Sequence, residues 1–132
     1  MREKNNGSII GETFFEKYQI KSLIDRGSFG QCFQGKNLEN NEDVCLKIER
    51  LSNEITYLKS ESTVLSSLQG GEGFPIFHAF GSTEKYNILV MELLGNSLKV
   101  EFDKNYRTFP IVFIAKIAIQ LVSININFIK YS

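Results

Sequence analysis

The sequence predicts an α+β fold, in which a five-stranded antiparallel sheet carries one packed helix and is followed by a linker and further helices. Short runs of alternating apolar and polar residues, separated by glycine- or asparagine-rich turns, occupy most of the first 92 residues. One stretch among them, 52–68, has apolar residues at helical spacing instead, and helical spacing returns after residue 97. With 132 residues and 42% hydrophobic content, the chain can form one domain with a core.

The strands are predicted from alternation and from the turns that bound it. They are expected at 18–24, 31–35, 43–49, 76–80 and Tyr86–Glu92. Polar, turn-rich residues at 36–42 and 81–85 read as hairpin loops. Residues 1–17 are expected to form a polar leader ahead of the sheet.

Helical spacing predicts three helices. The first is expected at 57–68, with Ser52 or Asn53 as its cap and with glycines and Pro75 ending it. Ser97 is placed to cap a short second helix. The third is expected from Ile111 to Val122; beyond it, β-branched residues alternate with polar ones as in a strand, so the tail stays undecided.

A glycine-rich turn and a lysine suggest a polyphosphate site. The turn, Gly27-Ser28-Phe29-Gly30, joins the first two strands, and Lys47 follows on the third. Glycines let main-chain N–H groups approach phosphate oxygens, and the lysine adds a fixed charge. A P-loop would need Gly-Lys-Ser/Thr, and a dinucleotide fingerprint would need a helix directly after the turn. Strand, glycine turn, strand, loop and strand with lysine is the order at the start of a protein kinase.

Composition excludes several other classes. Fifteen basic residues balance fifteen acidic ones, which gives no electrostatic footprint for nucleic acid. No apolar run approaches the ~18 residues of a membrane span, and no secretory signal is expected. Two cysteines do not make a disulfide framework. We therefore expect a reducing compartment, cytoplasmic or nuclear, and no nucleic-acid or membrane partner.

Two further segments resemble one kinase family. Gly70-Gly71-Glu72-Gly73-Phe74-Pro75 is similar to the casein kinase I motif before the fourth strand. Val90-Met91-Glu92-Leu93-Leu94-Gly95-Asn96-Ser97-Leu98 resembles that family's hinge. The resemblance to these serine/threonine protein kinases covers roughly residues 18–123. It implies a kinase N-lobe with its hinge at 18–95 and the first helices of a C-lobe at 96–132.

The resemblance also implies an ATP site. Its residues would be Ile24, Gly27, Ser28, Phe29, Gly30, Cys32, Cys45, Lys47, Glu61, Met91, Glu92, Leu94 and Ser97. The glycine turn would cover the phosphates, while Lys47 would contact the α- and β-phosphates and pair with Glu61. The Glu92 carbonyl and the Leu94 N–H would hydrogen-bond the adenine.

The remaining roles concern the walls of that site. Met91 would be the gatekeeper behind the adenine, and Ser97 would lie near the ribose. Ile24 and the two cysteines would form the upper apolar wall. Asp25 departs from the family's glycine, and Val100 departs from its aspartate beside the hinge. Both substitutions are expected to weaken contacts with ATP.

The sequence contains neither a His-Arg-Asp nor an Asp-Phe-Gly motif. Kinases take the catalytic aspartate and the Mg²⁺ ligands from these motifs. We therefore expect no catalytic residue and no metal site here, and no phosphoryl transfer by this chain alone. Full-length relatives would use Mg-ATP and protein substrates, and this chain would be a truncated fragment of such a kinase.

Other interpretations remain open. One alternative is a non-catalytic interaction module that docks a protein on the helix from Ile111 to Val122, and another is a gene fragment without function. Taken singly, the glycine turn fits an ordinary hairpin, Lys47 a surface lysine and Glu61 a solvated helix residue. The cysteines fit core fillers or alkylatable thiols shielded by nucleotide.

Overall fold

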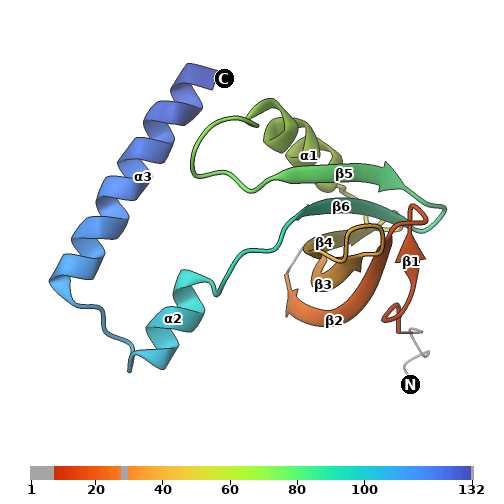
Figure 1. Cartoon of the computed structure of the whole chain (residues 1–132), viewed down its shortest axis with the longest axis horizontal. Coiled ribbons are helices and arrows are strands. Elements are labelled where there is room, and N and C mark those ends of the chain that lie inside the picture. The colour runs from red at the N-terminus through yellow and green to blue at the C-terminus, as the bar shows by residue number, and fades with distance from the viewer. Residues whose placement is uncertain (1–7, 28–29, 132) are drawn as a thin grey trace.

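The computed structural model describes residues 8–27 and 30–131, with side chains as far as residue 126. A twisted antiparallel sheet with one helix against it forms the first part (Figure 1). Two more helices follow and stand away from the sheet (Figure 1). The predicted α+β class, an antiparallel sheet with one packed helix followed by further helices, is confirmed. Ser28 and Phe29 of the glycine turn lie outside the described residues.

The sheet has six strands rather than the five predicted, in the order β1-β2-β3-β4-β6-β5. The strands are β1 Thr13–Phe14, β2 Tyr18–Arg26, β3 Gln31–Asn37, β4 Asp43–Arg50, β5 Phe77–Ser82 and β6 Tyr86–Glu92. The additional strand is β1, in which Phe14 pairs with Tyr18 of β2. A strand of two residues is too short to show alternation, so sequence periodicity missed it.

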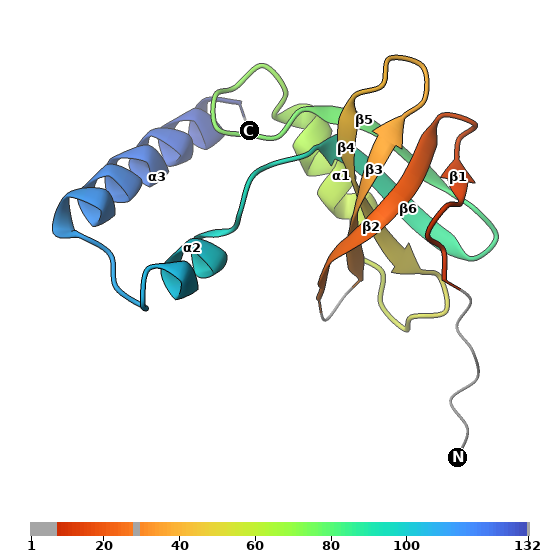
Figure 2. The same cartoon turned by 60° about the horizontal axis from the view of Figure 1, so that its bottom comes forward.

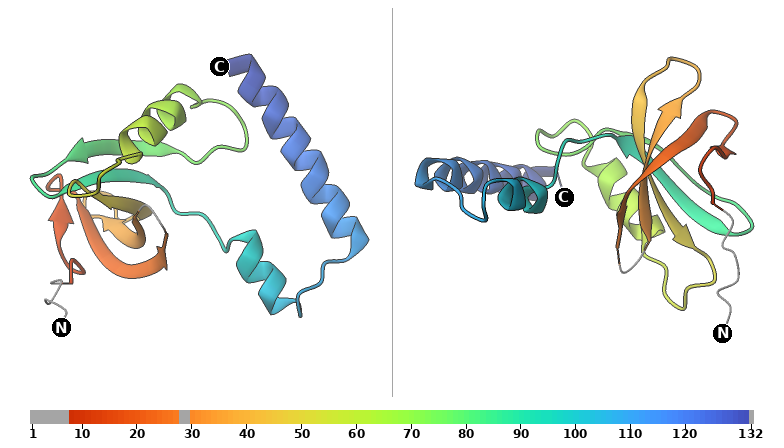
Figure 3. Two further views of the ribbon diagram at one scale, coloured as in Figure 1. Left: turned by 180° about the vertical axis from the view of Figure 1, so that it is seen from behind. Right: turned by 90° about the horizontal axis from the view of Figure 1, so that it is seen from below.

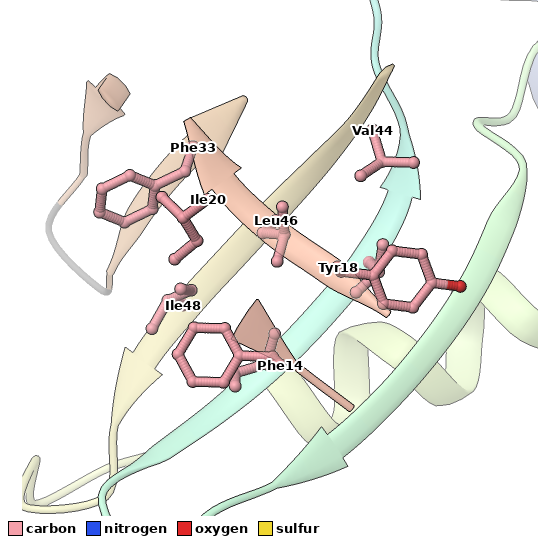
Figure 4. Packing of buried hydrophobic residues seen from close by; sticks show 9 residues of the cluster. Phe14, Tyr18, Ile20, Phe33, Val44, Leu46 and Ile48 are labelled. Carbon is pink, nitrogen blue, oxygen red and sulfur yellow. The ribbon is translucent and has the colours of Figure 1, made fainter. Parts of the chain in front are cut away.

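One face of the sheet forms the main hydrophobic core. Residues directly opposite one another in an antiparallel ladder point to the same face of the sheet. Along each strand, every second side chain also points to that face. The buried cluster on this face consists of Phe14, Tyr18, Ile20, Phe33, Val44, Leu46, Ile48, Ile88 and Val90 (Figure 4). Phe14 is only 7% exposed, so part of the expected leader belongs to the core.

The first helix, α1 Leu58–Ser67, packs against β4, β5 and β6. It lies on the opposite side of the sheet from β1 (Figures 2 and 3). The predicted caps Ser52 and Asn53 are wrong, because the helix begins later. The buried Glu49 carboxylate accepts hydrogen bonds from the backbone N–H groups of Tyr57, at 2.6 Å, and Leu58, at 3.3 Å. A cap contributed by a distant strand has no local sequence signature.

Two helices follow the sheet. Helix α2, Leu98–Lys104, begins as predicted at Ser97, whose hydroxyl accepts a 3.3 Å hydrogen bond from the Val100 N–H. Helix α3 runs from Ile111 to Tyr131, well past the predicted end at Val122. The strand-like alternation of the tail is thus misleading, since β-branched residues lower helix propensity only slightly. Within the described chain, no helix is both long enough and apolar enough to cross a membrane.

Candidate functional site

Lys47 and Glu61 meet between the sheet and α1. The lysine extends from the middle of β4 and the glutamate from the first turn of α1, where a negative charge suits the helix dipole. The Lys47 Nζ donates to both Glu61 carboxylate oxygens, at 2.8 and 2.7 Å. The predicted ion pair is therefore present. The side chains are 31% and 41% exposed, so the pair stabilises the fold by only ~0–1 kcal/mol. Its main effect is to hold the ammonium in place.

The described ends of the glycine turn lie beside the lysine strand. The Gly27 N–H donates a 2.8 Å hydrogen bond to the Gly30 carbonyl, which closes the turn. A Cβ on Gly30 would lie 2.4 Å from the carbonyl oxygen of Ile48, the residue after Lys47. Only glycine fits such a close approach of two backbones. The turn is thereby held against the strand that carries the candidate phosphate-binding lysine.

Sulfur atoms line the same face of the sheet. Cys32 is directly opposite Lys47 in the β3–β4 ladder, and Cys45 is directly opposite Met91 in the β4–β6 ladder. Cys45 is buried and Cys32 is partly exposed. The neighbouring Cys45 thiol lowers the pKa of Cys32 to about 7, with the Lys47 charge acting in the same direction. The Cys32 thiol, together with burial, raises the pKa of Cys45.

The predicted adenine-binding residues lie where the sheet passes into the linker to α2 (Figure 1). Strand β6 ends at Glu92, whose side-chain carboxylate accepts a 3.0 Å hydrogen bond from the Ile76 N–H. The Leu94 side chain, just beyond, is 60% exposed. Ser97 caps α2 with its hydroxyl. Their contacts with adenine and ribose remain predictions.

The chain matches named kinases over most of its length, although no family model matches it. It is 40% identical over 106 residues to casein kinase I homolog 3 of Schizosaccharomyces pombe and 39% identical over 107 residues to casein kinase I homolog RAG8 of Kluyveromyces lactis. It is 36% identical over 123 residues to casein kinase I homolog 2 of Saccharomyces cerevisiae. This chain is related to the casein kinase I family. The matches cover 80%, 81% and 93% of the chain.

The casein kinase I relatives are much longer than the matched segment. The aligned residues make up 24%, 20% and 22% of those three proteins. The chain therefore spans about a quarter or less of each relative. Activity, substrates and partners of a whole casein kinase I remain proposals for this chain.

Two departures from the casein kinase I pattern have clear positions. Asp25 pairs with Cys32 across the β2–β3 ladder, and Cys32 pairs with Lys47, so Asp25 lies on the same face of the sheet as Lys47. Its carboxylate accepts a 2.8 Å hydrogen bond from the neighbouring Arg26 N–H. Ile24 lies at the adjoining irregularity in β2 and is 51% exposed. Val100, 40% exposed, is in α2.

Sequence reasoning missed an apolar hollow next to the ion pair. A cavity of about 560 Å³ lies between α1 and the sheet, lined by Tyr57, Ser60, Glu61, Val64, Leu65, Leu68, Pro75 and Met91. Positions 57, 61, 64, 65 and 68 share one helical face, so their spacing was the available signal. A second hollow of about 480 Å³ includes Gly27 and Gly30 but neither Lys47 nor Glu61. We assign the candidate site to the face that carries the ion pair.

Proposed function

We propose that this chain is the ATP-binding portion of a serine/threonine protein kinase of the casein kinase I type. The observation that carries the proposal is the pair of hydrogen bonds from the Lys47 ammonium to both carboxylate oxygens of Glu61, on the strand next to the glycine turn. Residues 18–95 would form the N-lobe and hinge, and residues 96–132 would begin the second lobe. The relatives' names support the same assignment.

In this proposal the nucleotide packs against the face of the sheet that carries Lys47. The Lys47 ammonium, oriented by Glu61, contacts the α- and β-phosphates, and the glycine turn covers them. The apolar residues around Cys45 and Met91 pack on the adenine, whose edge bonds to the Glu92 carbonyl and the Leu94 N–H. The close approach of Gly30 to the Ile48 backbone holds this end of the turn against the strand that carries Lys47, which supports the proposal.

Phosphoryl transfer requires more than these residues. ATP would supply the transferable phosphoryl group, and Mg²⁺ would neutralise its charge. The sequence contains no His-Arg-Asp and no Asp-Phe-Gly motif. Hence the residues present fit nucleotide binding but not Mg²⁺ ligation by these motifs. We propose nucleotide binding for this chain and transfer to protein serine or threonine only for a whole kinase of this type.

Titration calorimetry with ATP tests the proposal on the 132-residue chain. A charge-assisted contact contributes ~1.5–3 kcal/mol, so Lys47→Ala should weaken ATP binding at least about tenfold. Lys36→Ala is the matched control, because Lys36 also pairs with a carboxylate across the sheet, with similar exposure of 28%. Its affinity should equal that of the wild type. A folded wild-type chain that binds no ATP, or equal losses in the two variants, contradicts the proposal.

A second candidate function is protein docking through α3. Its apolar side chains are exposed, with Ile111 at 80%, Ile119 at 68% and Val122 at 59%. Such a surface is typical of an interaction site. Substituting Ile114 and Ile119 by serine should then abolish recovery of a bound protein without changing ATP affinity. Unchanged recovery would reject α3 as the contact surface.

A further inference from the structure

The two cysteines of the chain lie on neighbouring strands and on one face of the sheet. In the β3–β4 ladder, Cys32 is opposite Lys47 and Cys45 is opposite Gln34. The cysteines are therefore diagonal neighbours, one two-residue step apart along the ladder. The register places both side chains on the same face, and Cys45 is the neighbour that most affects the pKa of Cys32. Both thiols are free.

The diagonal arrangement decides what can join these thiols. Diagonal neighbours have Cα atoms about 7–8 Å apart, whereas a disulfide requires them within ~7 Å. A direct disulfide would therefore require the strands to move. A single atom inserted between the sulfurs lengthens the bridge and removes that demand. A linear two-coordinate metal ion would hold the two sulfurs on opposite sides of the metal, whereas a pyramidal centre accepts two sulfurs from one face of the sheet, so a pyramidal centre fits better.

We propose that Cys32 and Cys45 form a dithiol site for a trivalent, thiophilic ligand of the organoarsenical class. A ligand bound at this site occupies the space beside Cys32 and Cys45 and thereby blocks the nucleotide cleft. This second part rests on the proposed function, because it places adenine against the same two side chains. The dithiol site itself depends only on the β3–β4 register, which places the two free thiols on one face of the sheet.

The chemistry of capture is a condensation without oxidation. Each sulfur forms a bond to arsenic, each bond from arsenic to a hydroxyl oxygen breaks, and the thiol protons leave with those oxygens as water. Arsenic stays trivalent, so no oxidant or reductant is required. Cys32 is partly exposed and can react first, after which Cys45 is held beside it for the second bond.

The surrounding charges favour reaction at Cys32. Lys47 lies directly opposite on β4 and promotes thiolate formation. Asp25 on β2 and Glu61 on α1 oppose it. The Cys45 thiol is the largest influence and, against the opposing effect of burial, lowers the pKa of Cys32 to about 7, which favours the reactive thiolate near neutral pH.

The test uses phenylarsine oxide and intact-mass spectrometry of the native 132-residue chain. The chain has only two cysteines, so bound arsenical reports on this pair alone. We expect one arsenical per chain, removed by 2,3-dimercaptopropanol but not by a monothiol. Cys32→Ser and Cys45→Ser should each lower retention about 10²-fold, since a second bond gains strongly from its high effective concentration. Cys45→Ala, which avoids a buried hydroxyl, should behave in the same way, and circular dichroism checks that each variant folds.

Equal retention by either folded single-cysteine variant would overturn the dithiol site. Retention that occurs only after denaturation would also overturn it. ATP calorimetry on the arsenical-bound chain tests the second part: affinity should be lost and then restored by the dimercaptan. Unchanged ATP affinity would reject only the second part of the proposal, the blocking of the nucleotide cleft, and would leave the dithiol site standing. A chain that retains arsenical through both cysteines but never binds ATP would support the dithiol site and overturn the proposed function.

Discussion

The sheet with α1 and the segment with α2 and α3 are stabilised in different ways. In the sheet, side chains such as Ile20 and Leu46 are fully buried, and partners come from distant strands. In α3, comparable side chains such as Ile111 and Ile119 are mostly exposed. Helix α3 lies apart from the sheet (Figures 1 and 3). Near the C-terminal end of α3, the Ile124 side chain approaches Gly73.

The second region has contacts of its own, but they are mainly local. Phe109 lies between Phe102 of α2 and Phe113 of α3, with ring centroids 5.2 and 4.8 Å away. Ser97 caps α2 within one helical turn. The comparison shows that burial against distant elements, not apolar content, separates a stable core from an apolar helix that keeps its side chains in solvent.

The largest expected effect on the free energy of unfolding comes from truncating a buried side chain in the core of the sheet. Leu46→Ala should lower the free energy of unfolding by ~2–5 kcal/mol, because it leaves a cavity at a fully buried position. Ile119→Ala in α3 is the control and should change it by less than ~0.5 kcal/mol. Urea denaturation followed by circular dichroism measures both values. Similar losses in the two variants would mean that α3 contributes to the same cooperative core.

A middle-sized effect is expected where the sheet holds α1. Glu49→Ala removes the acceptor for the N–H groups of Tyr57 and Leu58 and for the Asn87 amide, which donates at 3.1 Å. Loss of such a buried acceptor should cost about 1–3 kcal/mol. Hydrogen exchange should speed up in α1 first, and the Lys47–Glu61 contact should loosen. Exchange in α1 that matches the wild type would reject Glu49 as the main cap.

The smallest effect is expected from a local cap in the second region. Ser97→Ala removes the hydroxyl that accepts from the Val100 N–H, and a lost cap typically costs ~0.5–2 kcal/mol of helix stability. Because α2 has no buried residue, we expect faster hydrogen exchange in α2 and unchanged exchange in the sheet. Faster exchange in β4 or β6 would show that the two regions are coupled.

Sequence reasoning reached most of the scaffold but not its long-range details. Alternation and turns located five strands, and Ser97 was recognised as a cap because its partner is three residues away. Thr13–Phe14 was missed because two residues carry no period. Glu49 was missed as the cap of α1 because its partners lie eight and nine residues further on. The end of α3 was misplaced because β-branched residues suit both structures.

The sequence by itself determined the order of strands and helices, the glycine turn and the lysine of the third strand, since these depend on neighbours in the chain. The pairing of Lys47 with Glu61 was predicted only through the family resemblance, and the tertiary structure contains it. Only the tertiary structure decided that Glu49 reaches α1 and Asn87 and that Cys32 and Cys45 are diagonal neighbours on one face. These contacts depend on strand register and on the seating of α1. Both are set by burial of whole faces, which no short stretch of sequence specifies.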